Sequence, residues 1–106
     1  MRIRKNEPIS EEAKLIAAAS DALAHPLRVE LFKYIYKENM QRRGVCTKQL
    51  VEHFGYSQST ISQHMKKIVI SDLVQTKREN NCTNYYINLG MLGKYLSAVK
   101  QLNALH

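Results

Sequence analysis

The sequence predicts a mainly α-helical (α+β) domain in which a two-helix unit is followed by a β-hairpin, and three observations support this. Residues 47–70, TKQLVEHFGYSQSTISQHMKKIVI, contain two helical patterns joined at Gly55. Residues 73–88 carry strand-favouring side chains on both sides of Asn80–Asn81. Apolar residues recur at helical spacing before and after these segments. With 106 residues, the chain is long enough for one domain and too short for two.

Two helices are expected before residue 41. Ser10 is followed by two glutamates, which is typical of an N-cap with acids in the first turn, where they favour the helix dipole. Pro26 suits the first position of the next helix, and His25 is expected to be the residue that enters it. The segment 45–47 is too short for more than a stub of strand.

The two helices at residues 47–71 form the helix-turn-helix pattern that places one helix in the DNA major groove. We expect Thr47 to cap the first of them and Gly55 to end it in the left-handed conformation. We expect Ser57 to cap the second, the recognition helix 58–71. Its buried stripe consists of apolar residues at helical spacing: Ile61, Met65, Ile68 and Val69.

The opposite face of the recognition helix carries hydroxyls, amides and cations and no carboxylate. Such a surface can bond base edges and phosphates. Gln63 is the best candidate for reading a base, because an amide can bond adenine in bidentate fashion, and the lysines suit phosphate. The predicted DNA contacts are Ser57, Gln58, Ser59, Thr60, Ser62, Gln63, Lys66 and Lys67, with Lys77 and Arg78 from the hairpin.

The hairpin at residues 73–88 is interpreted as a wing beside the recognition helix. Lys77 and Arg78 approach its tip, where they either contact DNA or only add charge. Asn88 can cap a final helix at 89–105. The resulting order α-α-β-α-α-β-β-α is that of a winged helix-turn-helix domain.

The first and last helices carry more apolar surface than one small core needs. If these helices pair with those of a second copy across a two-fold axis, the apolar surface of both is buried. The dimer then places two recognition helices one DNA turn apart, ~34 Å, which fits a pseudo-palindromic operator in double-stranded DNA. The residues expected at this homodimer interface are Leu15, Ala19, Leu92, Tyr95, Leu96 and Val99.

Charge and composition narrow the function classes. The net charge is +7, and the excess lies at residues 40–80 and in a basic arm at residues 1–8, which contains Arg2, Arg4 and Lys5. This arm is either disordered or binds a groove. No apolar run has membrane-spanning length and no signal peptide is evident, so we expect a cytoplasmic protein without membrane contact.

Three segments together resemble the ArsR/SmtB family of repressors: SDALAHPLRVELFKYI at residues 20–35, TKQLVEHFGYSQSTISQHMKKI at 47–68 and DLVQTKRENNCTNYYINL at 72–89. The resemblance implies a dimeric, cytoplasmic bacterial transcription factor. In this family the regulator is usually a repressor that a metal ion or another inducer releases from its operator. It also implies dimerisation through the first and last helices.

Two departures from the family bear on the inducer. The family's arsenic-type Cys-x-Cys pair corresponds to Cys46 and Lys48, so one thiolate is absent, and a lone thiolate does not provide the usual coordination. The zinc-type site lies on the last helix, yet residues 89–105 contain no Asp, Glu or His and only His106 follows. We therefore expect no metal site, and the inducer stays unassigned.

Cys46 and Cys82 suggest a redox switch as a separate hypothesis, since some relatives sense oxidants with paired cysteines. The two residues belong to different elements, so we expect a disulfide between them to require backbone movement. His64, at the margin of the apolar stripe, is expected to have a structural or phosphate-proximal role rather than to bind metal.

The leading function is therefore a sequence-specific, dimeric DNA-binding regulator. The alternative is a winged-helix module that binds protein or RNA without operator specificity. No catalytic grouping, Gly-rich phosphate loop or cofactor motif stands out, so the chain is not expected to be an enzyme or to hold a cofactor.

Overall fold

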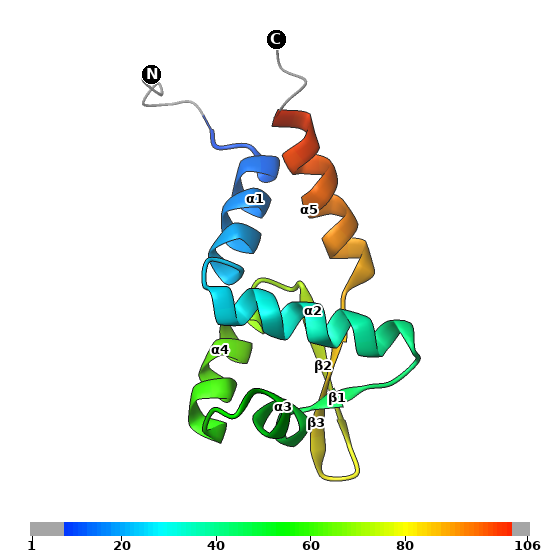
Figure 1. Ribbon diagram of the computed structural model, residues 1–106. Helices are drawn as coiled ribbons and strands as arrows, with labels where there is room; N and C mark the ends of the chain where they lie inside the picture. The colour runs from blue at the N-terminus through cyan, green and yellow to red at the C-terminus, as the bar shows by residue number, and fades with distance from the viewer. Residues whose placement is uncertain (1–7, 103–106) are drawn as a thin grey trace.

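The computed structural model describes residues 8–102, which form five helices and three strands in the predicted order. Figure 1 shows α1 and α5 side by side at one end of the molecule and the hairpin of β2 and β3 at the other. The elements are α1 (Glu11–Ala22), α2 (Pro26–Met40), β1 (Val45–Cys46), α3 (Thr47–Phe54), α4 (Gln58–Ile70), β2 (Val74–Glu79), β3 (Cys82–Ile87) and α5 (Leu89–Leu102). Most of the basic arm expected at 1–8 and the end of the helix expected at 89–105 lie outside the described residues, as does His106.

Most predicted helix boundaries are confirmed by local hydrogen bonds. Ser10 Oγ accepts from Ala13 N at 3.1 Å, and Asn88 Oδ1 accepts from Met91 N at 3.2 Å. His25 is the N-cap of α2, with its Nδ1 accepting from Leu27 N at 3.1 Å. Gly55 ends α3 at φ 76°, in the left-handed region that glycine adopts without a steric cost.

The prediction that Thr47 caps α3 is wrong. The N-cap is Cys46, which makes no side-chain cap bond, and Thr47 is the first residue of the helix. The Thr47 hydroxyl instead lies 2.9 Å from the hydroxyl of Tyr85 on β3. This contact between residues far apart in sequence joins α3 to the sheet.

The three strands form one antiparallel sheet in the order β1-β3-β2. Val45 pairs with Tyr85, and β2 pairs with β3 from Val74↔Ile87 to Glu79↔Cys82. Asn80 and Asn81 turn the hairpin at φ 50° and 62°, the positive values that a tight two-residue turn requires. Asp72, which precedes β2, has φ 70°, a conformation that Asp tolerates better than most residues.

The core lies where α2, α3 and α4 meet the sheet. Each of these helices contributes fully buried aliphatic side chains, and β1 and β2 close the core from the other side. The largest fully buried side chains are Leu31, Ile35, Val45, Leu50, Ile61, Met65, Ile68, Leu73 and Val74. No helix within residues 8–102 combines the length and apolar character needed to cross a membrane.

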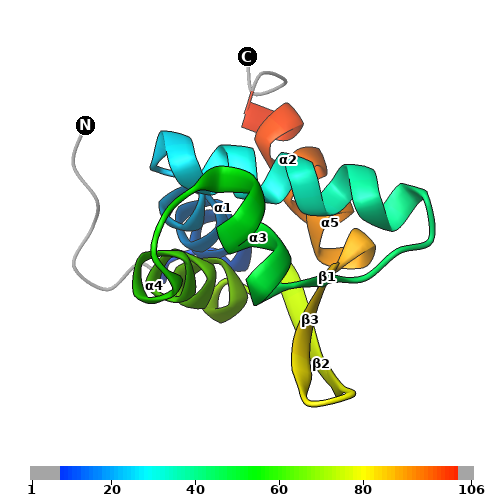
Figure 2. The same cartoon turned by 60° about the horizontal axis from the view of Figure 1, so that its bottom comes forward.

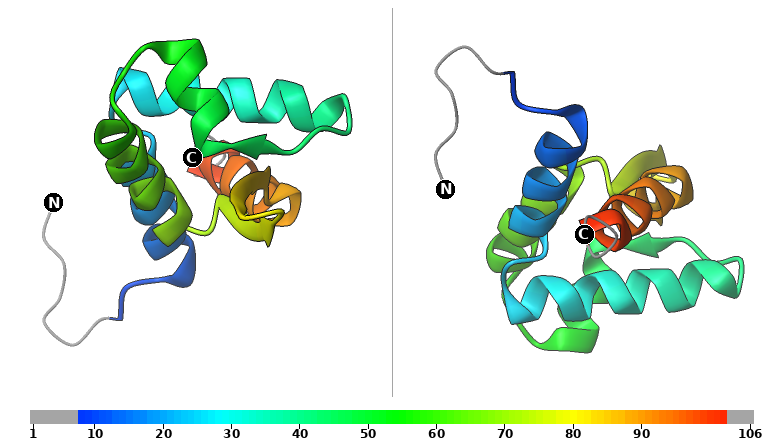
Figure 3. Two further views of the ribbon diagram at one scale, coloured as in Figure 1. Left: turned by 90° about the horizontal axis from the view of Figure 1, so that it is seen from below. Right: turned by 90° about the horizontal axis from the view of Figure 1, so that it is seen from above.

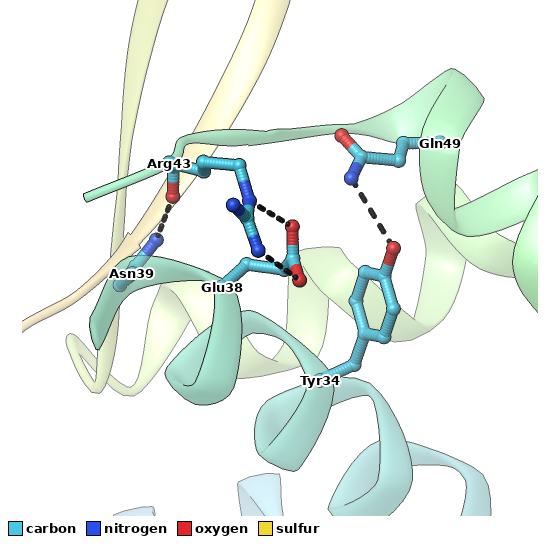
Figure 4. A network of polar contacts seen from close by, with 5 residues as sticks. All are labelled: Tyr34, Glu38, Asn39, Arg43 and Gln49. Carbon is cyan, nitrogen blue, oxygen red and sulfur yellow. Dashed lines mark hydrogen bonds and ion pairs between the residues drawn. The ribbon is translucent and has the colours of Figure 1, made fainter. Parts of the chain in front are cut away.

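A polar network holds the loop after α2 against its neighbours (Figure 4). Arg43 Nε donates to Glu38 Oε1 at 2.9 Å, and this hydrogen bond is the main reason that the pKa of Glu38 is lowered. Asn39 Nδ2 donates to the Arg43 carbonyl at 2.8 Å, while Asn39 Oδ1 accepts from Ile87 N at 2.8 Å. The end of α2 is thereby tied to β3, which fixes the base of the hairpin.

Candidate nucleic-acid interface

The recognition helix α4 is anchored on one side and open on the other. Ser57 Oγ accepts from Thr60 N at 3.1 Å and donates to Thr60 Oγ1 at 3.0 Å, which confirms Ser57 as the N-cap. Ile61, Met65 and Ile68 are buried. The helix ends at Ile70, with Ser71 as its C-cap.

The open side of α4 carries the side chains predicted to contact DNA. Thr60 is partly buried, and the other predicted residues of this segment are exposed: Ser57, Gln58, Ser59, Ser62, Gln63, Lys66 and Lys67. No acidic residue occurs in the helix. With the lower end of the molecule turned forward, α3, α4 and the β2–β3 hairpin all lie toward the viewer (Figure 2).

The two predicted wing residues lie on opposite faces of the hairpin, because successive residues of a strand alternate. Lys77 pairs with Asn84 in the ladder, and its Nζ lies 3.6 Å from Glu79 Oε2. Arg78 pairs with Thr83 and donates to its Oγ1 at 3.1 Å. Of the two cations, Arg78 lies on the side that borders α3 and α4.

Glu79 organises the Lys77 face of the wing. Its Oε1 accepts a hydrogen bond from the Tyr86 hydroxyl at 3.0 Å, and this bond raises the pKa of Tyr86 above its ordinary value. Gly44 lies against the same ring: a Cβ at this position would come within 2.6 Å of the Tyr86 hydroxyl oxygen. The absence of a side chain at residue 44 therefore lets Tyr86 reach Glu79.

A cleft of about 320 Å³ lies between α3, α4 and the wing. Gln58 and Ser62 reach it from α4, Lys48 from α3 and Arg78 from the wing. Neither Lys48 nor Tyr56, which is 48% exposed beside Ser57, is among the DNA contacts predicted from the sequence. The basic character of Lys48 and its place in the first turn of α3 were the available signals.

Cys46 and Cys82 both border this cleft as free cysteines. Cys46 pairs with Asn84, and Cys82 lies two residues further along β3, so the two are diagonal neighbours on one face of the sheet. Diagonal neighbours are about 7–8 Å apart, which is slightly beyond the usual reach of a disulfide. Within residues 8–102, no three His, Cys, Asp or Glu side chains gather in a way that could hold a metal ion.

The residues expected at a dimer interface fall into two groups. Leu96 and Val99 are 56% and 38% exposed on α5, and Leu15, Leu92 and Tyr95 are partly buried. Ala19 has no exposed area and packs inside the core of its own protomer, so it offers nothing to a second copy. Figure 3, right, looks down on the end of the molecule that α1 and α5 form. A groove of about 820 Å³ between them is lined by Leu15, Met91 and Ala98, among others.

Comparison with known proteins finds one family. Residues 25–76 match the sequence profile of the bacterial regulatory proteins of the arsR family. The arsenical resistance operon repressor of Staphylococcus xylosus is 32% identical over 75 residues, 71% of this chain and 67% of that protein. The repressor of the same name from Staphylococcus aureus is 36% identical over 59 residues, 56% of this chain and 57% of that protein. The chain thus spans little more than half the length of the latter.

Solved structures share the fold. An ArsR-like transcriptional regulator from Rhodococcus sp. RHA1 superposes with a TM-score of 0.76 at 17% identity, covering 90% of this chain and 85% of that one. The homodimeric winged helix-turn-helix DNA-binding domain of a possible ArsR-family regulator from Mycobacterium bovis gives 0.66 at 19% identity, covering 95% and 90%. At these identities the likeness shows the fold alone, and it agrees with the predicted winged helix-turn-helix.

Proposed function

The chain belongs to the arsR family of bacterial regulatory proteins, and we propose that it is a homodimeric, sequence-specific DNA-binding transcriptional repressor of the cytoplasm. In this proposal α4 enters the major groove and Gln63 reads a base. Lys66 and Lys67 bind phosphates, and the wing lies along the backbone or the minor groove.

The observation that carries the proposal is the exposed, acid-free face of α4. Its amides and hydroxyls can bond base edges, its lysines can bond phosphate, and the buried stripe behind it fixes which residues point outward. Lys48 and Arg78 extend the positive surface across the cleft to α3 and the wing. A polyanion that lies across α3, α4 and the wing would therefore meet cations on all three elements.

Dimerisation is proposed from the outer surface of α5 and the groove beside α1. Leu89, Leu96 and Leu102 are each more than half exposed, which is unusual for so many leucines on one short helix. A second copy that covers them would present two α4 helices to the operator. The Mycobacterium bovis neighbour is described as homodimeric, which supports the proposal of a dimer.

The arsenical resistance in the relatives' names belongs to those proteins. Cys46 is the single thiol at the start of α3, and Lys48 stands at the position that the family resemblance assigns to a second one. The inducer in this proposal is therefore not a metal ion held at α3.

Fluorescence anisotropy tests the DNA-binding proposal directly. The protein is titrated into a labelled duplex from the region upstream of its own gene and into a scrambled duplex of the same composition, across a salt series. We expect tighter binding to the native duplex and a linear fall of log affinity with log salt. Equal affinity for both duplexes would refute operator specificity at that region, and no duplex binding at any salt would favour a protein- or RNA-binding module.

Leu96→Asp tests the dimer, with Met40→Asp as its matched control. Both variants place a carboxylate at an apolar side chain that is about half exposed, but Met40 belongs to α2 and is not part of the α1–α5 surface proposed for dimerisation. We expect sedimentation to show a monomer for Leu96→Asp and a dimer for Met40→Asp, because a charge buried in an apolar interface is costly. Identical sedimentation of both variants would exclude Leu96 from the interface.

A further inference from the structure

One arginine joins the recognition helix to the corner between α1 and α2. Arg28 Nε donates to the carbonyl of Ala22, the last residue of α1, at 2.7 Å, and a second guanidinium nitrogen donates to the Asp21 carbonyl at 3.3 Å. A third nitrogen of the same group lies 3.2 Å from Nδ1 of His64 on α4. A single partly buried side chain of α2 thus bonds both neighbouring helices.

The chemistry of these contacts fixes the protonation state of His64. A guanidinium group has only donors, so Nδ1 of His64 must be the acceptor, which requires a neutral ring with its proton on Nε2. His25 lies beside it, with its Nδ1 accepting from Leu27 N as the N-cap of α2. The two rings are 4.6 Å apart between centroids. Protonation of Nδ1 of His64 removes the acceptor that Arg28 uses.

The surroundings of His64 disfavour its protonation. Burial lowers its pKa most, followed by the neighbouring His25 and Arg28. Arg28 belongs to α2, and His25 is the N-cap of that helix. Asp21, at the end of α1, bonds Arg28 through its main-chain carbonyl. The elements α3 and β2, which also pack against α4, supply no charged group that shifts the pKa of His64. A proton on His64 would therefore stand beside a guanidinium group with no carboxylate to offset it.

We propose that Arg28 and His64 are positioning residues for the recognition helix, and that protonation of His64 releases α4 from the α1–α2 corner. This inference rests on the proposed function, in which α4 reads DNA. Gln63 and Lys67 flank His64 within one helical turn, so a shift of α4 moves both. Acidification then lowers the ratio of affinities for operator and other DNA. The added positive charge on His64 at the same time strengthens the attraction of the protein to phosphates of any sequence. The opposite signs of these two effects make them separable.

The test compares the wild type with His64→Asn, with His53→Asn as control. The asparagine oxygen can accept from Arg28 at the place of Nδ1 but does not titrate. His53 is exposed on α3 and packs on Tyr34 and Phe54, away from Arg28. Affinity for the native and the scrambled duplex is measured at pH 7.5 and at the lower pH at which nitrogen-15 NMR shows the His64 ring of the wild type to be protonated. We expect the native-to-scrambled ratio of the wild type and of His53→Asn to fall about fivefold, the effect of losing one hydrogen bond, and the ratio of His64→Asn to stay constant.

Nitrogen-15 NMR of the His64 ring in the protein without DNA provides an independent readout. We expect a protonated Nε2 and a bare Nδ1 at pH 7.5, and a change of the amide signals of α4 as the ring titrates. A proton on Nδ1 at pH 7.5, or an equal loss of the ratio in wild type and His64→Asn, would overturn the proposal. If neither duplex binds at any pH, the proposed function fails while the NMR titration still decides whether His64 holds α4.

Discussion

The cap of the recognition helix offers the sharpest test, because the chain contains a matched control for it. Ser57 and Ser10 are both N-caps with extended backbones, at φ −66° and −67°. Each accepts a hydrogen bond of 3.1 Å from the main-chain nitrogen three residues later. Ser57→Ala and Ser10→Ala therefore remove the same bond from α4 and from α1.

The stability cost of both variants follows from this shared geometry. Loss of an N-cap hydroxyl costs about 1 kcal/mol. For a domain of this size, that loss lowers the melting temperature by about 4–8 °C. The additional bond from Ser57 to the Thr60 hydroxyl is exposed and adds little. The DNA affinities should differ, because only Ser57→Ala frays the turn that holds Gln58 and Ser59. Re-ordering that turn on DNA costs up to about 1 kcal/mol, or about fivefold in affinity.

Thermal unfolding followed by circular dichroism measures the first effect, at one fixed protein concentration, since dimerisation makes the melting temperature depend on concentration. Anisotropy on the native duplex measures the second. We expect both variants to melt earlier and only Ser57→Ala to bind more weakly. Equal loss of affinity in the two variants would show that the ordered first turn of α4 has no special part in binding, and an unchanged melting temperature for Ser57→Ala would contradict the capping bond itself.

Three further outcomes are expected. Gln63→Ala should lose about 1–3 kcal/mol of binding free energy on the preferred sequence and relax the preference at one base position per half-site. Lys67→Ala should weaken binding to all duplexes alike and reduce the salt slope by about one. Anisotropy on a set of single-base variants of the duplex separates the two effects. Gly44→Ala should destabilise the fold by about 1–3 kcal/mol, because its Cβ would displace the Tyr86 ring, and urea unfolding of Gly44→Ala with and without Tyr86→Phe should show partial recovery. Stability should be constant above about pH 6.5 and fall below it, since the lowered pKa of His64 means that the unfolded chain binds the proton first; urea unfolding from pH 7.5 to 5.5 measures this, and a flat profile in the wild type would contradict it.

The sequence predicted those elements whose boundaries are set by neighbouring residues. Ser10, Ser57 and Asn88 accept hydrogen bonds from nitrogens three residues away, and Gly55 adopts a positive φ by its own nature. Such signals operate within one turn of chain, so a single sequence contains all that is needed to read them. The buried stripe of α4 followed from helical periodicity in the same way.

The features that the sequence did not reveal depend on contacts between distant residues. The residue type and position of Thr47 are those of an N-cap, but its hydroxyl is hydrogen-bonded to the hydroxyl of Tyr85, 38 residues later. Lys48 and Arg78 come to one cleft through the packing of α3 and α4 beside the wing. Successive residues such as Lys77 and Arg78 always lie on opposite faces of a strand, but which of the two faces α3 and α4 depends on the ladder register, which the residues of one strand do not specify by themselves.

The polar residues of the chain divide by where they make their bonds, and this division bears on function. Glu38, Arg43 and Glu79 bond to other side chains and hold the loop after α2 and the wing in place. Gln63 and Lys67 make no side-chain hydrogen bond or ion pair with any residue between 8 and 102, and both are exposed on α4. Replacing the first group should therefore change stability, and replacing the second should change binding with little change in stability. A variant of Gln63 or Lys67 that unfolds as the wild type does and yet binds DNA differently would locate the function on this face of α4 without reference to any relative.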